Sequence, residues 1–155
     1  MKVSNSKLII IRQLDNKLQL FNNLVKIKPY PKGWINQIRT SLNMSRNQLG
    51  DYLKITPQGV ADIEKREAEE TITLKSLREA GEALNLKLVY GFVAKDGSLE
   101  ALIEKKAKEQ ALNIIKRTST TMKLEDQENS TTRLQEALKE MTDDIKKELP
   151  KSLWD

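Results

Sequence analysis

Residues 46–63 read RNQLGDYLKITPQGVADI, and this stretch carries the most specific structural signal in the chain. Its apolar side chains recur at spacings that bury one face of each of two short helices. The fifth residue must be small, because the second helix of such a pair crosses directly over it. The constrained positions hold Leu49, Gly50, Leu53, Ile55, Val60 and Ile63. The stretch therefore predicts a helix-turn-helix.

The residues that precede the two helices are suited to cap them. Ser45 stands before the first helix, and Gln48 follows three residues later, which is the spacing of a capping box. Thr56 stands before the second helix, and Pro57 occupies its first position, where the missing N–H of proline costs nothing. The caps and the apolar pattern indicate the same helix boundaries.

Lys54 occupies a turn position at which such motifs usually carry glycine, because the backbone there takes a positive φ. A lysine in that conformation costs about 1 kcal/mol relative to glycine. Two interpretations remain open. Either the ammonium of Lys54 lies near a phosphate, or the residue is strained and its side chain is solvated.

Helical periodicity continues on both sides of the motif. Residues 6–26 place apolar side chains three or four positions apart, and Pro29 and Pro31 end this predicted helix. Between residues 34 and 84 the pattern predicts a run of short helices, interrupted by a loop over residues 67–71.

The apolar period changes to two over residues 86–93, which predicts a β-strand. A lone strand needs a partner for its backbone groups. We expect the same strand of a second copy to supply it. The dimerising residues would be Leu86, Leu88, Val89, Tyr90 and Phe92.

The C-terminal third is predicted to be helical again. Ser98 can cap a helix, and residues 118–132 hold seven Ser or Thr, which predicts a linker or a frayed helix. An amphipathic stripe then runs through Leu134, Leu138, Met141, Ile145 and Leu149. It must be buried against the N-terminal helix, a second copy or a partner protein. We expect residues 118–155 to be dispensable for DNA binding but needed for partner binding or dimer stability.

The expected organisation has four segments. They are an N-terminal helix with a proline linker (1–32), a helix-turn-helix DNA-binding domain (33–85), a strand and turn (86–97), and a C-terminal helical extension (98–155).

Composition narrows the possible functions. The 155 residues include no cysteine and no histidine, which excludes disulfides, zinc fingers, thiol nucleophiles and Ser-His-Asp triads. We expect no enzymatic activity, no metal and no cofactor. No apolar run approaches the ~20 residues that span a bilayer, so we expect a cytoplasmic protein without a membrane partner.

The net charge of +5 is concentrated near the N-terminus, where residues 1–32 carry seven Lys or Arg and one acidic residue. This distribution favours an anionic partner such as nucleic acid. A solvated basic surface is the alternative.

Residues 34–64 resemble the phage-repressor-like helix-turn-helix family. A longer stretch, from residue 12 to about residue 107, resembles the mobile mystery protein A family. This resemblance rests on Arg12–Asp15, Pro31–Ile35, Gln58–Lys65, Thr71–Leu77 and Leu88–Tyr90. Proteins of that family are encoded beside a second protein that carries a Fic domain, in an arrangement like that of toxin and antitoxin.

The resemblance and the periodicity together predict a mainly α fold. It would have a lambda-repressor-like helix-turn-helix core, an N-terminal helix, one short dimerising β-strand and C-terminal helices. The resemblance implies a protein that binds an operator in double-stranded DNA and represses its own operon, with a Fic-domain protein as a further partner. We expect it to be a homodimer, because one helix-turn-helix makes too few contacts and the lone strand can pair with that of a second copy.

The resemblance also implies which residues would meet DNA. The second motif helix would lie in the major groove, where Gln58 would pair with adenine and Asp62 would accept from cytosine. Arg46 stands where the family usually has a glutamine that contacts phosphate. The full set of expected DNA-binding residues is Arg46, Asn47, Lys54, Thr56, Pro57, Gln58, Gly59, Ala61, Asp62, Lys65 and Arg66. For the polar and charged side chains among them, a solvated surface position is the alternative.

Arg39 and Glu64 are assigned to the fold, because the resemblance implies a partly buried ion pair between them. The alternative function is a protein-binding inhibitor with little DNA-binding role. Inhibitory helices of Fic systems carry the pattern Ser/Thr-x-x-x-Glu-Gly/Asn. Here only Glu128-Asn129 approaches it, and Leu124 stands where the hydroxyl should be. The missing motif favours DNA binding over direct inhibition.

Overall fold

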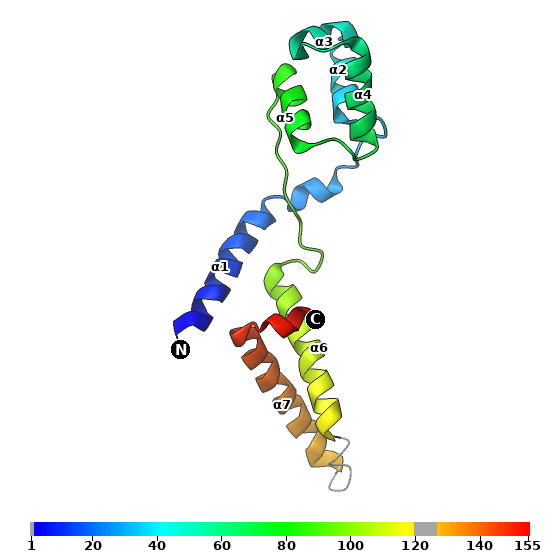
Figure 1. Ribbon diagram of the computed structural model, residues 1–155. Coiled ribbons are helices and arrows are strands. Elements are labelled where there is room, and N and C mark those ends of the chain that lie inside the picture. The colour runs from blue at the N-terminus through cyan, green and yellow to red at the C-terminus, as the bar shows by residue number, and fades with distance from the viewer. Residues whose placement is uncertain (1, 120–126) are drawn as a thin grey trace. The chain divides into compact units, whose positions relative to one another are not determined.

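The computed structural model describes residues 2–119 and 127–155, and in this part of the chain the protein is mainly helical (Figure 1). The helices are α1 (Lys2–Gln19), the 3-10 helix η1 (Asn22–Lys26), α2 (Gly33–Ser41), α3 (Arg46–Leu53), α4 (Pro57–Ala68), α5 (Leu74–Ala83), α6 (Leu99–Ser119), α7 (Gln127–Glu148) and the 3-10 helix η2 (Lys151–Trp154). The mainly α fold class is confirmed.

The chain divides into two compact units. Residues 24–91 form the α2–α5 unit. Residues 1–23 and 92–155 form the second, which we call the α1/α6/α7 unit. The sequence-based division kept the N-terminal helix apart from the C-terminal extension, whereas the structure places both in one unit.

The α2–α5 unit is built from helices of 8 to 12 residues. Isolated helices shorter than ~12–15 residues are marginal in water, so packing and capping must hold these in place. Leu49 and Val60 are completely buried at 0% exposure. Ile35, Ala80 and Leu84 complete the buried cluster.

A carboxylate from α4 caps the start of α2. Glu67 accepts the backbone N–H groups of Trp34 (2.9 Å) and Ile35 (2.9 Å). Gly33 has a φ of +81°, and a Cβ there would lie 2.7 Å from Oε2 of Glu67. Glycine therefore suits both the backbone conformation and the approach of the carboxylate. The loop predicted over residues 67–71 is wrong for its first two residues, because α4 continues through Ala68.

In the α1/α6/α7 unit, α6 and α7 run antiparallel side by side, and α1 packs against both (Figure 1). Ala107 and Ala111 of α6 are completely buried, and their small side chains let the neighbouring helices approach closely. The buried cluster and the apolar side chains packed on it are Ile11, Ile103, Ala107, Ile145, Leu149 and Leu153. The C-terminal end of the α7 stripe, at Ile145 and Leu149, thus packs on this cluster, whereas Leu134 at its other end is 43% exposed.

Asp15 joins α1 to the start of α6. It is buried, and its two carboxylate oxygens accept the N–H groups of Leu99 (2.7 Å) and Glu100 (3.1 Å). The hydroxyl of Ser98 accepts from the N–H of Ala101 at 3.0 Å, which confirms the predicted cap. A negative charge is favourable at a helix N-terminus, where the first N–H groups lack partners within the helix.

The β-strand predicted over residues 86–93 is wrong. Residues 86–94 have no regular secondary structure, and the described part of the chain contains no strand at all. Leu88 is half-buried, whereas Leu86, Val89, Tyr90 and Phe92 are all exposed, so the alternating pattern does not separate two faces. The physical reason is the missing partner, because a strand forms only when a neighbouring segment pairs with its backbone.

Two other predicted boundaries differ from the structure. The helix expected over residues 6–26 ends at Gln19 and is followed by η1. The Ser/Thr-rich stretch is helical at both ends, because α6 extends to Ser119 and α7 begins at Gln127. The middle of that predicted linker, residues 120–126, lies outside the described residues.

None of the helices in the described ranges is both long enough and apolar enough to cross a membrane.

Candidate nucleic-acid interface

The stretch that predicts a helix-turn-helix forms α3, a three-residue turn and α4. A Cβ added to Gly50 would lie 2.6 Å from the carbonyl oxygen of Ile55, so only glycine allows the turn to come this close. The N–H of Ile55 also donates to the carbonyl oxygen of Gly50 at 2.9 Å. Gly50 therefore fixes the path by which the chain enters α4.

Both predicted caps are present. The N–H of Gln48 donates to the Ser45 hydroxyl (3.1 Å), and the N–H of Ser45 donates to Oε1 of Gln48 (2.8 Å), which completes the capping box. The N–H of Gly59 donates to the Thr56 hydroxyl at 3.0 Å, with Pro57 in the first helical position. The caps of α3 and α4 are thus neutral hydroxyls.

Lys54 ends α3 in the left-handed conformation, with φ 56° and ψ 41°. The positive φ predicted from the sequence is confirmed. The side chain is exposed, so its ammonium is available to an anion. Its role in DNA binding stays a prediction.

Glu64 of α4 gathers three polar side chains at the base of the motif. Arg39 donates to its carboxylate through Nε (2.5 Å) and Nη2 (3.3 Å), and Asn36 donates at 3.0 Å. The side chains of Arg39 and Glu64 are 9% and 5% exposed, which confirms the expected buried ion pair. Burial acts to raise the pKa of Glu64, but hydrogen bonds from Arg39 and Asn36 and the charge of Arg39 outweigh it and lower that pKa.

Arg46, the expected phosphate-contacting residue, is also bound to this carboxylate. Its Nε lies 3.3 Å from Oε2 of Glu64, while half of its side chain remains exposed. Arg46 is therefore anchored through Nε at the first turn of α3, beside the neutral cap of that helix. Arg39 is held further inward, where its Nη1 donates to the carbonyl oxygen of Met44 at 2.8 Å.

One face of α4 points to solvent, and the polar residues that line it are spaced four and three residues apart. Gln58, Asp62 and Lys65 share this face and are exposed. Nε2 of Gln58 donates to Oδ1 of Asp62 at 3.1 Å. Nζ of Lys65 lies 3.8 Å from Oε1 of Glu69. Nε of Arg66 donates to the backbone carbonyl oxygen of Asp62 at 3.4 Å.

The remaining expected DNA-binding residues lie at the starts of α3 and α4. Asn47, Thr56 and Pro57 are exposed, whereas Gly59 and Ala61 are half-buried. The structure thus brings the expected set together on α3, the turn and α4. The expected dimerising residues do not belong to these elements, since they lie in residues 86–92, the extended segment that follows α5.

Two contributors to this region were not predicted from the sequence. Glu67 caps α2, and Asn36 completes the contacts of Glu64. A signal for the first exists in the sequence, since Lys32 is a poor capping residue before α2 and some other group must serve its N–H groups.

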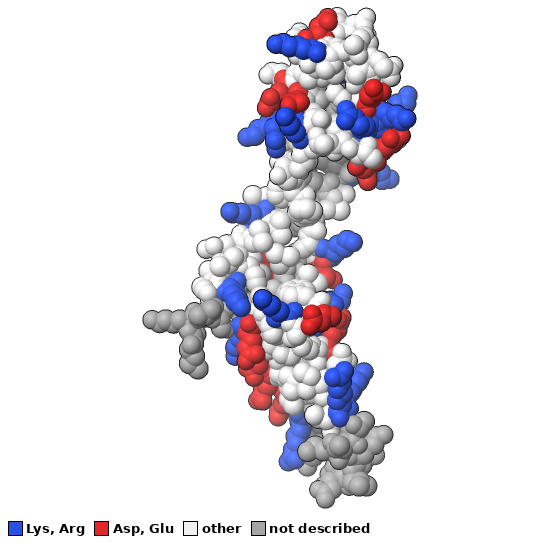
Figure 2. Space-filling model, viewed as in Figure 1, with Lys and Arg blue, Asp and Glu red and all other residues white. Residues whose placement is uncertain are grey.

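Charge alone does not mark the site. On the face shown in Figure 2, acidic side chains lie among the basic ones over both units. The geometry of α3 and α4, and not the surface charge, distinguishes this region.

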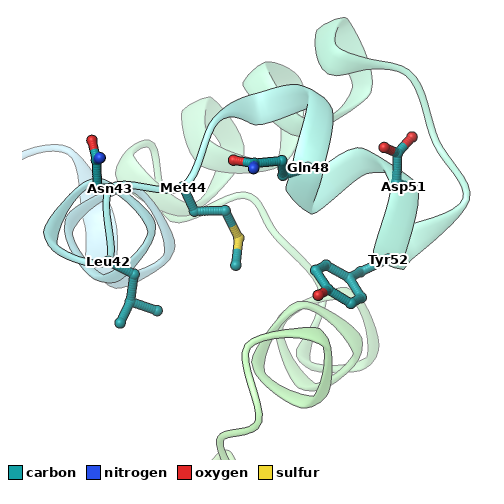
Figure 3. A pocket seen from close by; sticks show the side chains of 6 residues that line it. All are labelled: Leu42, Asn43, Met44, Gln48, Asp51 and Tyr52. Carbon is teal, nitrogen blue, oxygen red and sulfur yellow. The ribbon is translucent and has the colours of Figure 1, made fainter.

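Two surface depressions accompany the motif. The larger, of about 500 Å³, lies where α2 connects to α3 (Figure 3). Met44 and Tyr52 extend toward the same space there, and Asp51 points away from it. The smaller, of about 300 Å³, is a mostly apolar groove between α2, α5 and residues 86–89. Neither brings together the convergent charged groups that a specific polar ligand requires.

No group of three or more acidic, histidine or cysteine residues in the described ranges is placed to hold a metal ion. No protein-family model, curated protein or solved structure matches this chain.

Proposed function

We propose that this protein is a sequence-specific DNA-binding regulator of transcription that reads the major groove with the outward face of α4. The observation that carries the proposal is the division of α4 into two faces. Val60 and Glu64 are buried against α2 and α3, whereas Gln58, Asp62 and Lys65 stay exposed along the opposite side. An exposed helical face of amide and charged groups can reach base edges in the major groove.

The finer fold assignment, a phage-repressor-like helix-turn-helix domain, belongs to the same proposal. Three observations support it. The turn approaches Gly50 so closely that a Cβ would not fit, Lys54 takes the left-handed conformation, and Arg39 pairs with Glu64. The resemblance to the mobile mystery protein A family adds support from the sequence.

The hydroxyl caps of α3 and α4, a kind of cap that α5 shares at Thr73, leave the starts of both helices open to a phosphate contact. The starts of α2 and α6 are each occupied by a carboxylate, Glu67 and Asp15 respectively. The starts of α3 and α4 carry only neutral hydroxyl caps, so the positive end of each helix dipole is not compensated by a bound anion. Arg46, anchored beside the start of α3, adds a positive charge there.

A homodimer is the expected binding species, because one helix-turn-helix makes few base contacts and two copies can read two half-sites. Exposed apolar side chains of the extended segment, including Phe92 at 79% exposure, support burial against another chain. Sedimentation at micromolar concentration tests this part, and a monomer there would contradict it.

The Fic-domain partner rests on the sequence resemblance alone. Co-purification with the product of a neighbouring Fic-domain gene tests it, and failure to co-purify would contradict it.

The test of DNA binding is an anisotropy titration with a labelled duplex from the region upstream of the protein's own gene, and with a scrambled duplex of equal length. Gln58→Ala should weaken binding to the first duplex by ~5- to 150-fold and leave the second nearly unchanged. Arg46→Ala should weaken both and reduce the salt dependence.

Gln135→Ala is the matched control, because Gln135 is an exposed glutamine on α7. The proposal is wrong if the wild-type protein binds the two duplexes equally. It is also wrong if Gln58→Ala behaves like Gln135→Ala.

A further inference from the structure

Gln58 and Asp62 are hydrogen-bonded to each other on a face where neither side chain packs against the core. Both are exposed, they lie one helical turn apart, and Nε2 of Gln58 is 3.1 Å from Oδ1 of Asp62. An exposed pair of this kind contributes only a few tenths of a kcal/mol to helix stability. Its position on the outward face of α4 gives it a different significance.

The charge of Asp62 decides which way the Gln58 amide is turned. An ionised carboxylate can only accept hydrogen bonds, so the NH2 group of Gln58, and not its carbonyl, must face Asp62. A glutamine without such a neighbour can exchange its oxygen and nitrogen by rotating the terminal torsion. Asp62 removes that freedom and leaves Oε1 of Gln58 directed elsewhere.

The neighbouring charges do not compete for this carboxylate. Lys65 pairs with Glu69 one turn further on, and Arg66 donates to the backbone carbonyl of Asp62 and not to its side chain. The amide of Gln58 is therefore the side-chain group that the Asp62 carboxylate holds.

The oriented pair presents a defined pattern to a base edge. Gln58 offers one acceptor and one remaining N–H, and the free carboxylate oxygen of Asp62 offers a further acceptor. In the major groove adenine presents an N6 donor beside an N7 acceptor, which complements the amide of Gln58. Guanine presents two acceptors, O6 and N7, which would face the acceptors and the negative charge of the pair.

We propose that Asp62 is a positioning residue that fixes the Gln58 amide so that α4 selects adenine and rejects guanine at the contacted base. This inference rests on the proposed DNA-binding function and assigns a specificity within it. The carboxylate lowers affinity for every DNA sequence, because it is repelled by phosphates, and it contributes discrimination in return.

The experiment measures competition binding against a panel of operator duplexes in which each base pair is replaced in turn. Gln58→Ala first identifies the contacted position as the one where discrimination is lost. At that position, Asp62→Asn should reduce the preference for adenine over guanine by about tenfold, because asparagine can donate as well as accept and no longer fixes the amide. Asp62→Asn should also bind unrelated DNA more tightly than wild type.

Asp51→Asn is the control, because it removes the same charge from an exposed position on α3 without touching Gln58. Adding Asp62→Asn to Gln58→Ala should not reduce the preference for adenine over guanine any further. The inference is overturned if Asp62→Asn keeps the wild-type adenine preference or matches Asp51→Asn, and DNA binding itself would survive that result. If the wild-type protein shows no preferred duplex, the proposed function and this inference both fail.

Discussion

The two compact units of this chain are both helical, but different interactions hold them together. The α2–α5 unit packs short helices around a buried ion pair, with Arg39 and Glu64 almost without exposure. The α1/α6/α7 unit packs helices of 18 to 22 residues along a seam that includes the buried Ala107 and Ala111. Both units have a buried apolar cluster, but the first adds a buried ion pair, whereas the second adds the buried Asp15 carboxylate that caps α6.

The units share one device, a carboxylate from a distant helix that caps a helix start. Glu67 serves α2 in one unit and Asp15 serves α6 in the other. The difference is that α3 and α4 keep neutral caps, Ser45 and Thr56. Thr73 of α5 is a neutral cap as well, so the start of α3 is set apart by the positive charge of Arg46 beside it.

The largest expected effect is a loss of stability in one unit only. Glu64→Ala leaves Arg39 buried without its partner and should destabilise the α2–α5 unit by about 3–5 kcal/mol. The chain has two tryptophans, Trp34 in this unit and Trp154 in the other. In the Trp154→Phe background, the fluorescence of Trp34 follows urea unfolding of the α2–α5 unit. In the Trp34→Phe background, the fluorescence of Trp154 follows the α1/α6/α7 unit. An equal shift in both titrations would contradict the comparison.

The next effect tests the carboxylate cap of α2 against a matched glycine. Gly33 and Gly97 both have positive φ, but a Cβ at Gly97 would meet nothing within 4 Å. Gly97→Ala should cost only the backbone term of ~1–2 kcal/mol. Gly33→Ala should cost ~1–3 kcal/mol more, because its Cβ displaces Glu67. Thermal unfolding of the two variants gives the difference, and equal losses would show that the cap does not depend on Gly33.

Acid should act on the α2–α5 unit through Glu64. The folded-state pKa of Glu64 lies below its ordinary value of 4.5, so the folded state binds fewer protons. Its stabilisation is therefore complete above pH 4.5 and is lost as the pH falls through the folded-state pKa, with a slope of at most ~1.4 kcal/mol per pH unit. Glu64→Gln should be less stable than the wild type at neutral pH, but its free energy of unfolding should change less as the pH falls. Parallel pH profiles for the two proteins would refute this role.

The smallest effect concerns Lys54. Lys54→Gly should stabilise the α2–α5 unit by about 1 kcal/mol, because glycine takes the left-handed conformation without penalty. Weaker DNA binding with a shallower salt dependence would support the phosphate-contact interpretation. Unchanged DNA binding would support the other interpretation, in which Lys54 is strained and its side chain is solvated. A loss of stability would contradict the account of this turn.

Features that depend on neighbouring residues were predicted from the sequence more fully than contacts between distant segments. The two helices α3 and α4, their caps and the positive φ of Lys54 were predictable, because each depends on residues close together in sequence. The Arg39–Glu64 pair was expected from the family resemblance. The Gln58–Asp62 hydrogen bond joins residues four apart, so the spacing was visible, but the pairing was not predicted.

Contacts between distant segments were harder to predict. Asp15 was visible as the one acidic residue in the first 32, on the apolar side of a predicted helix, yet nothing in the sequence identifies α6 as its partner. The alternating residues 86–93 predicted a strand, because local pattern cannot show whether a pairing segment exists. The stripe of α7 was predicted and the N-terminal helix was among its expected partners, but α6 was not.

Backbone amide NMR shifts of the full chain, recorded with and without the upstream duplex, identify the helices that contact DNA. We expect the largest changes at the start of α3, in the turn at Lys54 and along α4 from Pro57 to Arg66. Amides of α6 and α7 should change little. Changes concentrated in α1, α6 or α7, with α4 unaffected, would contradict the proposal that α4 reads DNA.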